Sequence, residues 1–328
     1  MGRKKKKTFD LNDLKSFEFN KEIIDLQTFP LDCLLNGGYE KGSLNEIVGE
    51  AMTGKTTIAC QLAWKLCINN HKVLYVDTDG KVSKNMLETI GLAEYLNSNF
   101  FYVRFSSFSK VEEVLDSYIL TDEIDFIIID SIASLISDVF TNLESGVSIT
   151  TSNSAYNSRP LTNFISKYNA IAKEKNICFL FINQLRNKVD PKLGTLPKIY
   201  GSKNIQNNCS TIIKISSINK SSRFSNFKDY PKYSKGCDLE FELIKSNRTI
   251  PNKKVPFYFS FGSGIESKYN VIYGLIENKI VIQENGCYKF KDNDVVDNYF
   301  PDIDNLFEKI DYEYVEKYRD DIYQFYNK

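Results

Sequence analysis

The sequence predicts an α/β fold in which a largely parallel sheet is covered by helices on both faces. Short runs of Ile, Val, Phe and Leu alternate along the chain with segments whose apolar residues recur at helical spacing. Most of these runs are continuously apolar, which is typical of strands buried on both faces of a sheet. The chain has 328 residues, enough to form one large domain and a smaller one.

Strands and helices are expected in regular alternation along the first half of the chain. Each apolar run ends in polar or glycine residues, and Gly91 closes the second helix. The expected strands are residues 43–49, 72–79, 100–105, 125–130 and 176–184, and the expected helices are residues 54–70, 83–91, 111–120 and 159–176. This alternation of strand and helix predicts a parallel sheet.

The second half of the chain begins with three strands that have no helices between them. They are residues 210–218, 238–246 and 255–261. Consecutive strands without crossover helices predict an antiparallel extension of the sheet. We therefore expect three parts: a basic N-terminal arm with a short oligomerisation segment (1–28), a core (29–265), and a small C-terminal α/β domain with an acidic end (266–328).

Charge and hydropathy restrict the kind of protein this is. The 42 basic residues match the 42 acidic ones, so a nucleic-acid site must come from local patterning and not from overall charge. The basic start MGRKKKK has no apolar run behind it, and no apolar stretch reaches the roughly 18 residues of a membrane span. We expect a cytoplasmic protein without a membrane partner, in a bacterium or, if phage-encoded, in its host.

The seven cysteines and the single histidine exclude several kinds of site. No two cysteines form a CxxC pair, so reduced and mostly buried thiols are expected rather than disulfides or zinc ligands. His71 lies in the polar stretch NNHK, which argues against a catalytic triad built on histidine.

The stretch GEAMTGKT, Gly49 to Thr56, is a phosphate-binding loop between a strand and a helix. Gly49 and Gly54 let the backbone curl so that its N–H groups point at phosphates. Lys55 is expected to reach the β- and γ-phosphates, and the Thr56 hydroxyl to bind Mg²⁺. The sequence thus predicts ATP and Mg²⁺ bound by Gly49, Glu50, Ala51, Met52, Thr53, Gly54, Lys55, Thr56 and Thr57.

Polar residues at the ends of other strands complete the predicted site. Asp130 follows four apolar residues and is expected to orient Mg²⁺ and its waters. Asp79, or alternatively Asp77, is the candidate to polarise the attacking water. Gln184, after Asn183, is a candidate sensor of the γ-phosphate. The alternative for each carboxylate is a strand-end residue that only caps a turn.

Five segments resemble the RecA-type recombinases in order and spacing. They are GEAMTGKT, YVDTDG, IIIDSIASL, FLFINQLRNKV and FSFGSGI, and the resemblance covers the chain from about Leu26 onward. The stretch LIKSNRTIPNKKVPFYFSFGSGIES, with the small domain after it, looks most like bacterial RecA and the phage UvsX-like recombinases. The run DTDG instead resembles the DTEG of the eukaryotic and archaeal branch.

The resemblance implies roles for individual residues. Lys55, Thr56 and Asp130 match the phosphate and Mg²⁺ ligands, and Gln184 matches the glutamine that links the nucleotide to the second DNA-binding loop. Asp79 stands where the family has a catalytic Glu. Lys245 and Arg248 resemble cations that reach the γ-phosphate of the neighbouring protomer. Phe261 and Gly262 resemble the segment that covers the adenine from that neighbour.

The resemblance also implies that two loops, about residues 137–158 and 186–205, contact DNA. The second holds five cations against the single acid Asp190, which suits a phosphate backbone, and Tyr200 would stack between bases. The alternative is a solvated mobile loop. The expected DNA contacts are Arg159, Arg186, Lys188, Lys192, Lys198, Tyr200, Gly201 and Lys203.

Three departures from the family pattern affect these expectations. Asp79 is one methylene shorter than Glu, so ATP hydrolysis is expected to be slow. Ser202 replaces a glycine, and Gln206–Asn207 replaces a Lys–Phe pair that couples protomers. The N-terminal segment that would support polymerisation is short, with its expected contacts at Leu14, Phe17 and Phe19.

The leading hypothesis is an ATP-dependent recombinase that forms a filament on single-stranded DNA and pairs it with homologous duplex. Its partners would be the two DNAs, further copies of itself, and single-strand-binding and mediator proteins. The alternative is a non-catalytic or weakly hydrolysing paralogue that acts as a recombination mediator or an ATP-gated DNA-binding module. A hexameric helicase fits less well, because KSNR and FSFGSGI are present and no separate N-terminal primase-binding domain is found.

Overall fold

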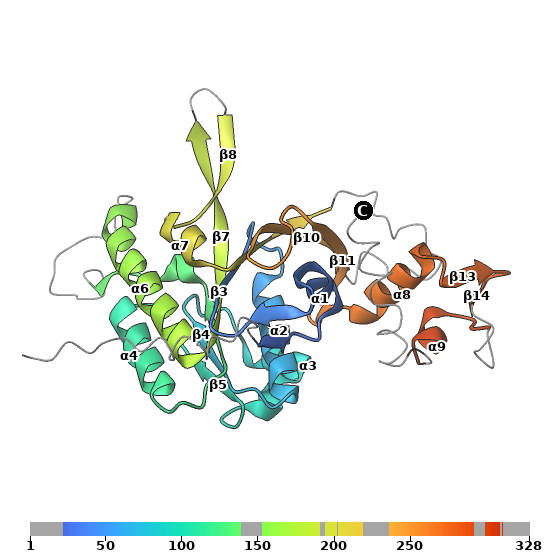
Figure 1. Ribbon diagram of the computed structural model, residues 1–328, viewed down its shortest axis with the longest axis horizontal. Helices are drawn as coiled ribbons and strands as arrows, with labels where there is room; N and C mark the ends of the chain where they lie inside the picture. Colours follow the sequence, from blue (N-terminus) through green and yellow to red (C-terminus); the bar gives the residue numbers. More distant parts are fainter. Residues whose placement is uncertain are drawn as a thin grey trace, which may run out of the picture.

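A ten-stranded mixed sheet forms the centre of the computed structural model, which describes residues 22–138, 153–190, 194–201, 203–218, 236–291, 299–308 and 310 (Figure 1). Its strand order is β12-β11-β10-β9-β3-β7-β6-β4-β5, with β8 paired to β7. The strands are β3 (Leu44–Gly49), β4 (Val73–Asp77), β5 (Phe100–Val103), β6 (Phe126–Asp130), β7 (Cys178–Asp190), β8 (Gly194–Ile199), β9 (Thr211–Ser217), β10 (Gly236–Ser246), β11 (Lys254–Ser260) and β12 (Gly264–Ile265).

The sheet is parallel from β5 to β9 and antiparallel from β9 to β12. The predicted α/β fold with an antiparallel extension is therefore confirmed. One detail was wrong, because β9 runs parallel to β3 and the extension begins only at β10. The helix α7 (Lys203–Asn208) precedes β9 and supplies the crossover that the sequence did not predict.

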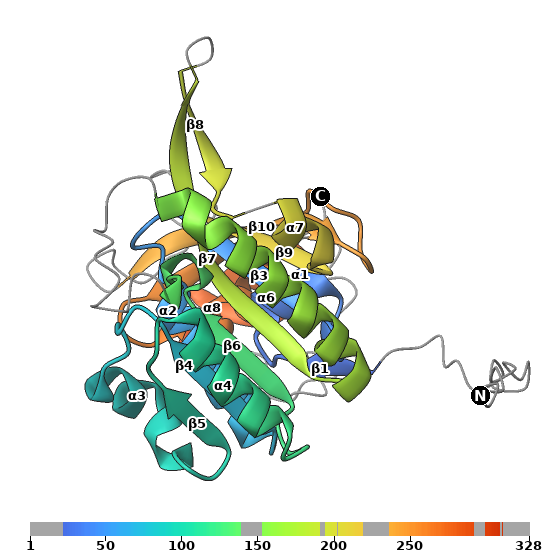
Figure 2. The ribbon, with the colours of Figure 1, turned by 90° about the vertical axis from the view of Figure 1, so that its left-hand side faces the viewer.

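Helices cover both faces of the sheet (Figures 1 and 2). The strands send alternate side chains to opposite faces, so Tyr75 and Ile128 pack in one core and Leu74 and Ile127 in the other. One face carries α2 (Lys55–Ile68), α3 (Lys84–Ile90) and the short 3₁₀ helix η2 (Leu92–Tyr95), and the other carries α4 (Phe108–Ile119), η3 (Ile132–Ser134), α6 (Asn153–Lys175) and α7.

The N-terminal part of the described chain packs into this core. Strand β1 (Ile23–Asp25) pairs with β2 (Gly38–Glu40), and α1 (Phe29–Leu35) lies between them in sequence. Ile24 and Leu26 are fully buried, so this end of the predicted oligomerisation segment belongs to its own chain's core. The basic arm and Leu14, Phe17 and Phe19 lie outside the described residues.

The C-terminal residues form α8 (Ser267–Glu277), the hairpin β13 (Val281–Glu284) and β14 (Cys287–Phe290), and α9 (Ile303–Glu308). Ile272, Val281 and Tyr288 are fully buried and continue the core that lies under α1 and α2. The acidic end beyond residue 310 lies outside the described residues. Across the ranges that the structure describes, none of the helices has the length and apolar character needed to span a membrane.

The prediction that residues 186–205 form a loop is wrong, because most of them lie in strands or a helix. Strand β7 continues to Asp190, β8 pairs with it antiparallel, and α7 begins at Lys203. The β7–β8 hairpin projects from the body of the molecule in both views (Figures 1 and 2). Residues 139–152 of the first predicted loop lie outside the described residues.

Candidate nucleotide-binding site

The phosphate-binding loop lies between β3 and α2, at the edge where the parallel strands end. Because the carboxyl ends of parallel strands meet at one edge, β4, β6 and β7 bring their terminal residues to the same place. The result is a cavity of about 400 Å³ lined by Ala51, Met52, Thr53, Gly54, Lys55, Thr56, Thr57, Asp79, Lys81, Asp130, Ser131, Ile182 and Gln184. Three strand-end residues predicted from the sequence thus line one cavity with the loop.

Two glycines in the loop are required by close contacts. A Cβ on Gly49 would lie 2.8 Å from the carbonyl oxygen of Ile215 and 2.8 Å from Thr53 Oγ1. Gly54 has a φ of +73°, and a Cβ there would lie 2.5 Å from Cζ of Phe259. Phe259 of β11 therefore packs on the loop, a role for which the sequence carries no local signal.

Lys55 is held inside the loop by backbone carbonyls. Its ammonium donates to the carbonyl oxygen of Gly49 at 3.0 Å and to that of Glu50. Burial lowers the pKa of Lys55 to about 8, while Asp130 and Asp79 oppose the shift. A cation that is this poorly solvated gains strongly from an anionic partner, which a phosphate group would supply.

Thr56 and Asp130 meet in the cavity. Asp130 accepts hydrogen bonds from the hydroxyls of Tyr75, at 2.8 Å, and Thr56. Burial raises the pKa of Asp130, and these two hydrogen bonds oppose the rise. A carboxylate and a hydroxyl beside a phosphate-binding loop form an all-oxygen donor set that fits Mg²⁺, which takes its other ligands from phosphate and water.

The structure distinguishes Asp77 from Asp79, the two candidates for the carboxylate that polarises the attacking water. Asp77 is fully buried, and its carboxylate accepts from the backbone N–H groups of Gly80 (2.7 Å) and Val82 (3.1 Å) and from the hydroxyl of Tyr102 (2.7 Å). Asp77 is thus the carboxylate that caps the turn. Asp79 lines the cavity and is the one that can face a water.

The Asp79 carboxylate already has partners within the cavity. Its Oδ2 lies 2.6 Å from Nζ of Lys81 and accepts from the Ser131 hydroxyl at 3.4 Å. Neither Lys81 nor Ser131 was predicted as a site residue. The sequence could have indicated them by position, because Lys81 comes two residues after Asp79 and Ser131 comes directly after Asp130.

A buried network behind the cavity connects β3 to the hairpin. Glu46 of β3 accepts from the Asn183 amide at 2.5 Å, and the same amide donates to the carbonyl oxygen of Tyr200 at 2.8 Å. Tyr200 N–H donates to the carbonyl oxygen of Gln184 at 3.0 Å. Burial raises the pKa of Glu46 to about 7. Asn183, paired in the sequence with Gln184, therefore faces this network and not the cavity.

Lys245 and Arg248 lie away from the cavity, bonded to their own chain. Lys245 donates to the carbonyl oxygens of Gln206 (2.9 Å) and Asn207 (3.1 Å), at the end of α7. Arg248 donates to the carbonyl oxygens of Gly38 (3.1 Å) and Asn36 (3.2 Å). Their predicted contact with a neighbouring protomer's phosphate stays a prediction.

Phe261 and Gly262 form the turn after β11. The Phe261 ring is 60% exposed and lies 6.5 Å, centroid to centroid, from the Phe259 ring that packs on Gly54. The segment therefore lies near the phosphate-binding loop of its own chain. Its predicted cover of an adenine in the next protomer stays a prediction.

The predicted DNA contacts gather on and near the hairpin. The strand register places Arg186 opposite Lys198 and Lys188 opposite Leu196, so the three basic positions fall on one face of the ribbon. Tyr200 and Gly201 follow β8, exposed Lys203 begins α7, and exposed Arg159 lies on α6. Lys192 lies outside the described residues.

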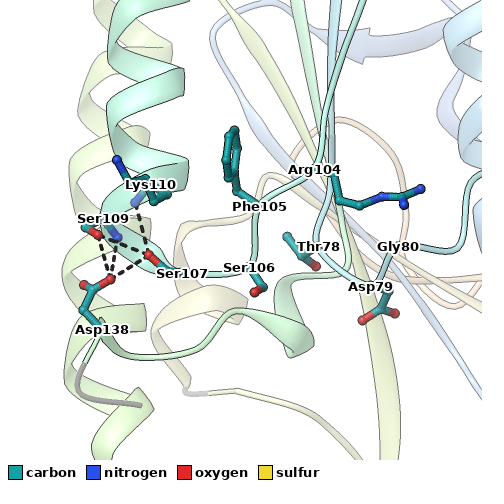
Figure 3. Close-up of a pocket in the computed structure, with 10 residues that line it drawn as sticks. All are labelled: Thr78, Asp79, Gly80, Arg104, Phe105, Ser106, Ser107, Ser109, Lys110 and Asp138. Atoms are coloured by element: carbon teal, nitrogen blue, oxygen red, sulfur yellow. Dashed lines mark hydrogen bonds between the residues drawn. The ribbon is translucent and has the colours of Figure 1, made fainter. Parts of the chain in front are cut away.

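A second, more open cavity of about 740 Å³ is also lined by Asp79 (Figure 3). At its far wall Asp138 accepts from the hydroxyls of Ser107 and Ser109, both at 2.7 Å. Ser137 and Asp138 begin the first predicted DNA loop, and Asn157 near its end accepts from the backbone N–H of Ser137 at 2.9 Å. The two ends of that loop are thus held together beside the cavity.

Comparison with known proteins gives one family. A family model of the RecA N-terminal domain matches residues 10–266. Protein RecA of Borreliella burgdorferi is 21% identical over 280 residues, which cover 85% of this chain and 72% of the relative. Protein RecA of Mycoplasma pneumoniae is 24% identical over 307 residues, which cover 87% of this chain and 83% of the relative.

An archaeal relative is similar over a shorter stretch. The DNA repair and recombination protein RadB of Methanococcus maripaludis is 30% identical over 230 residues, 68% of this chain and 99% of the relative. Since the family model covers more than half of the sequence, the chain belongs to the RecA N-terminal domain family.

Proposed function

We propose that this chain is an ATP-dependent DNA recombinase of the cytoplasm, which forms a filament on single-stranded DNA and promotes homologous pairing and strand exchange. The observation that carries the proposal is the continuity of β7. This strand brings Gln184 to the nucleotide cavity and runs on, within a few residues, to Arg186 and Lys188 in the projecting hairpin. A movement of Gln184 in response to the γ-phosphate would therefore be transmitted along one strand to the basic hairpin that faces DNA.

ATP hydrolysis would use the cavity residues as follows. Backbone N–H groups of the loop and Lys55 hold the phosphates, while Thr56 and Asp130 hold Mg²⁺, which supplies charge neutralisation when bound. Asp79 orients a water whose oxygen bonds to the γ-phosphorus as the bond to the bridging oxygen breaks. ADP and phosphate leave, and the water's proton passes to solvent.

Removing the hairpin cations tests their role in DNA binding. Arg186→Ala with Lys188→Ala is expected to weaken binding to single-stranded DNA and to reduce the slope of log affinity against log salt by about 0.7 for each phosphate that is no longer neutralised. Fluorescence anisotropy of a labelled oligothymidine at several salt concentrations measures both. Lys84→Ala with Lys173→Ala, a change of equal charge at exposed positions on α3 and α6, is the control. An unchanged slope in the hairpin variant would contradict this role.

The second candidate is a weakly hydrolysing paralogue that mediates recombination or acts as an ATP-gated DNA-binding module. The observation that favours it is the placement of Lys245 and Arg248, because both are bonded to carbonyls of their own chain. The shorter Asp79 and the polar Gln206–Asn207 pair point the same way.

Electron microscopy separates the candidates. With single-stranded DNA and a non-hydrolysable ATP analogue, a recombinase is expected to form long helical filaments, and Lys55→Ala is expected to form none. Short or monomeric species on DNA would favour the mediator, and closed rings would favour a helicase. Filaments that form equally without nucleotide would contradict the ATP dependence of assembly.

A further inference from the structure

A second lysine lines the nucleotide cavity beside Lys55. Lys81 lies in the turn after β4 and lines the cavity; its side chain is 57% exposed, and its ammonium lies 2.6 Å from Asp79 Oδ2. Asp79 is more enclosed, with 11% of its side chain exposed. The pair therefore lies at the cavity wall, with the cation on the open side.

Hydrogen bonds to the buried Asp77 hold the backbone of the turn that carries Lys81. The buried Asp77 carboxylate accepts from the backbone N–H groups of Gly80, Lys81 and Val82, at 2.7, 3.2 and 3.1 Å. Tyr102 donates to the same carboxylate at 2.7 Å. The backbone at Lys81 is thus held in place, so the flexible part is the lysine side chain alone.

The charges around Lys81 keep it protonated and close to Asp79. Its hydrogen bond to Asp79 raises the pKa of the Lys81 ammonium, and Asp130 and Asp77 raise it further. Lys55 lines the same cavity, and the two ammonium groups repel each other. While this ion pair lasts, the Asp79 carboxylate is partly neutralised and is a poorer acceptor for a water proton.

The cavity needs a second cation from some source. ATP with one Mg²⁺ keeps about two negative charges, and Lys55 neutralises one of them. Among the described residues that line the cavity, Lys55 and Lys81 are the cations. Lys245 and Arg248 are bonded to carbonyls elsewhere in the chain, so within one chain Lys81 is the cation in position.

We infer that Lys81 is a second phosphate-contacting cation of this site, which moves from Asp79 to the terminal phosphate of a bound nucleoside triphosphate. This inference rests on the proposed ATP hydrolysis and assigns a residue to its γ-phosphate recognition. The exchange of partners frees the Asp79 carboxylate when a triphosphate is present. A diphosphate, which lacks the terminal group, leaves the Lys81–Asp79 pair intact.

Affinity for fluorescent nucleotides tests the inference without relying on turnover. Lys81→Ala is expected to weaken binding of a mant-labelled non-hydrolysable ATP analogue by about tenfold or more, because it removes a charge-assisted hydrogen bond. Binding of mant-ADP is expected to change little. Lys81→Arg is expected to restore the preference for the triphosphate, because it returns the charge.

Matched variants separate this role from a structural one. Lys84→Ala removes an exposed lysine three residues away, paired with Glu88 at 3.3 Å, and is expected to change neither affinity. Lys81→Gln keeps most of the side chain without the charge and is expected to behave like Lys81→Ala. If the ratio of the affinities for the ATP analogue and for ADP is the same in both neutral variants as in the parent, the inference is overturned while the proposed function stands. If the parent chain binds neither nucleotide, the proposed function fails and this inference with it.

Discussion

Asp79→Glu is expected to raise the DNA-stimulated rate of ATP hydrolysis by about ten- to hundredfold. The added methylene moves the carboxylate roughly 1.5 Å further into the cavity, toward the water it must orient. A misplacement of about 1 Å at a reacting group can cost on the order of 100-fold in rate. The cavity of about 400 Å³ has room for the longer side chain, so the variant is expected to fold normally.

A coupled spectrophotometric assay with saturating single-stranded DNA measures this effect in kcat. Asp79→Asn keeps the size of the side chain without its charge, and is expected to hydrolyse more slowly than the parent while still binding nucleotide. The Michaelis constant is expected to change less than kcat, because Asp79 acts on the water and not on ATP itself. Equal kcat values for the parent, the Glu variant and the Asn variant would show that Asp79 does not orient the water.

The strand-end residues could be predicted because parallel strands impose their own geometry. Asp130 and Gln184 each follow an apolar run, and the carboxyl ends of such runs meet at one edge of the sheet. The alternation of strands could not separate Asp77 from Asp79, because the two residues are an even number of positions apart. The choice depended on the turn, where three backbone N–H groups converge on Asp77.

Other parts of the site depend on contacts between distant segments. Phe259 packs on Gly54 across 205 positions of sequence, and no local pattern indicates that contact. The β7–β8 hairpin was predicted to be a loop from the resemblance and from its polar, glycine-bearing sequence, and Pro197 does not favour a strand interior. Both strands of an isolated ribbon are edges, however, and an edge tolerates proline. The hydrogen bonds of Lys245 to the end of α7 join residues about 40 positions apart, and no local pattern indicates them either; its predicted contact with a neighbouring protomer stays a prediction.

Glu46→Gln is expected to make the protein more stable by about 3 kcal/mol at pH 8, and by less than about 1 kcal/mol at pH 5. Glu46 is fully buried in β3, its Oε1 accepts from Asn183, and its Oε2 has no hydrogen-bond partner among the residues that the structure describes. Burial raises its pKa from 4.5 to about 7, so the native state holds a proton that the unfolded chain releases. Each pH unit between those values is worth about 1.4 kcal/mol.

The sign follows from which state binds the proton. Below about pH 4.5 both states are protonated and the buried carboxyl is neutral. As the pH rises from about 4.5 to about 7, the unfolded chain releases a proton that the native state keeps, so stability falls by roughly 3 kcal/mol in total and is level at higher pH. Glutamine is neutral throughout and removes this slope. The nearby Cys209 thiol does not contribute in this range, because burial raises its pKa well above the usual value.

Urea denaturation from pH 5 to pH 8.5 tests the effect, with the transition midpoint as the readout. Glu123→Gln is the matched control, because that carboxylate is exposed and pairs with Lys72 at the surface, an interaction worth little. The parent and control curves are expected to fall together between pH 5 and about pH 7 and to level off above it, and the Glu46→Gln curve to stay level throughout. Parallel curves for all three proteins would mean that Glu46 is not the proton site. If the Glu46→Gln variant has a level stability curve and also binds DNA more weakly than the parent, the Glu46–Asn183–Tyr200 network positions the base of the hairpin as well.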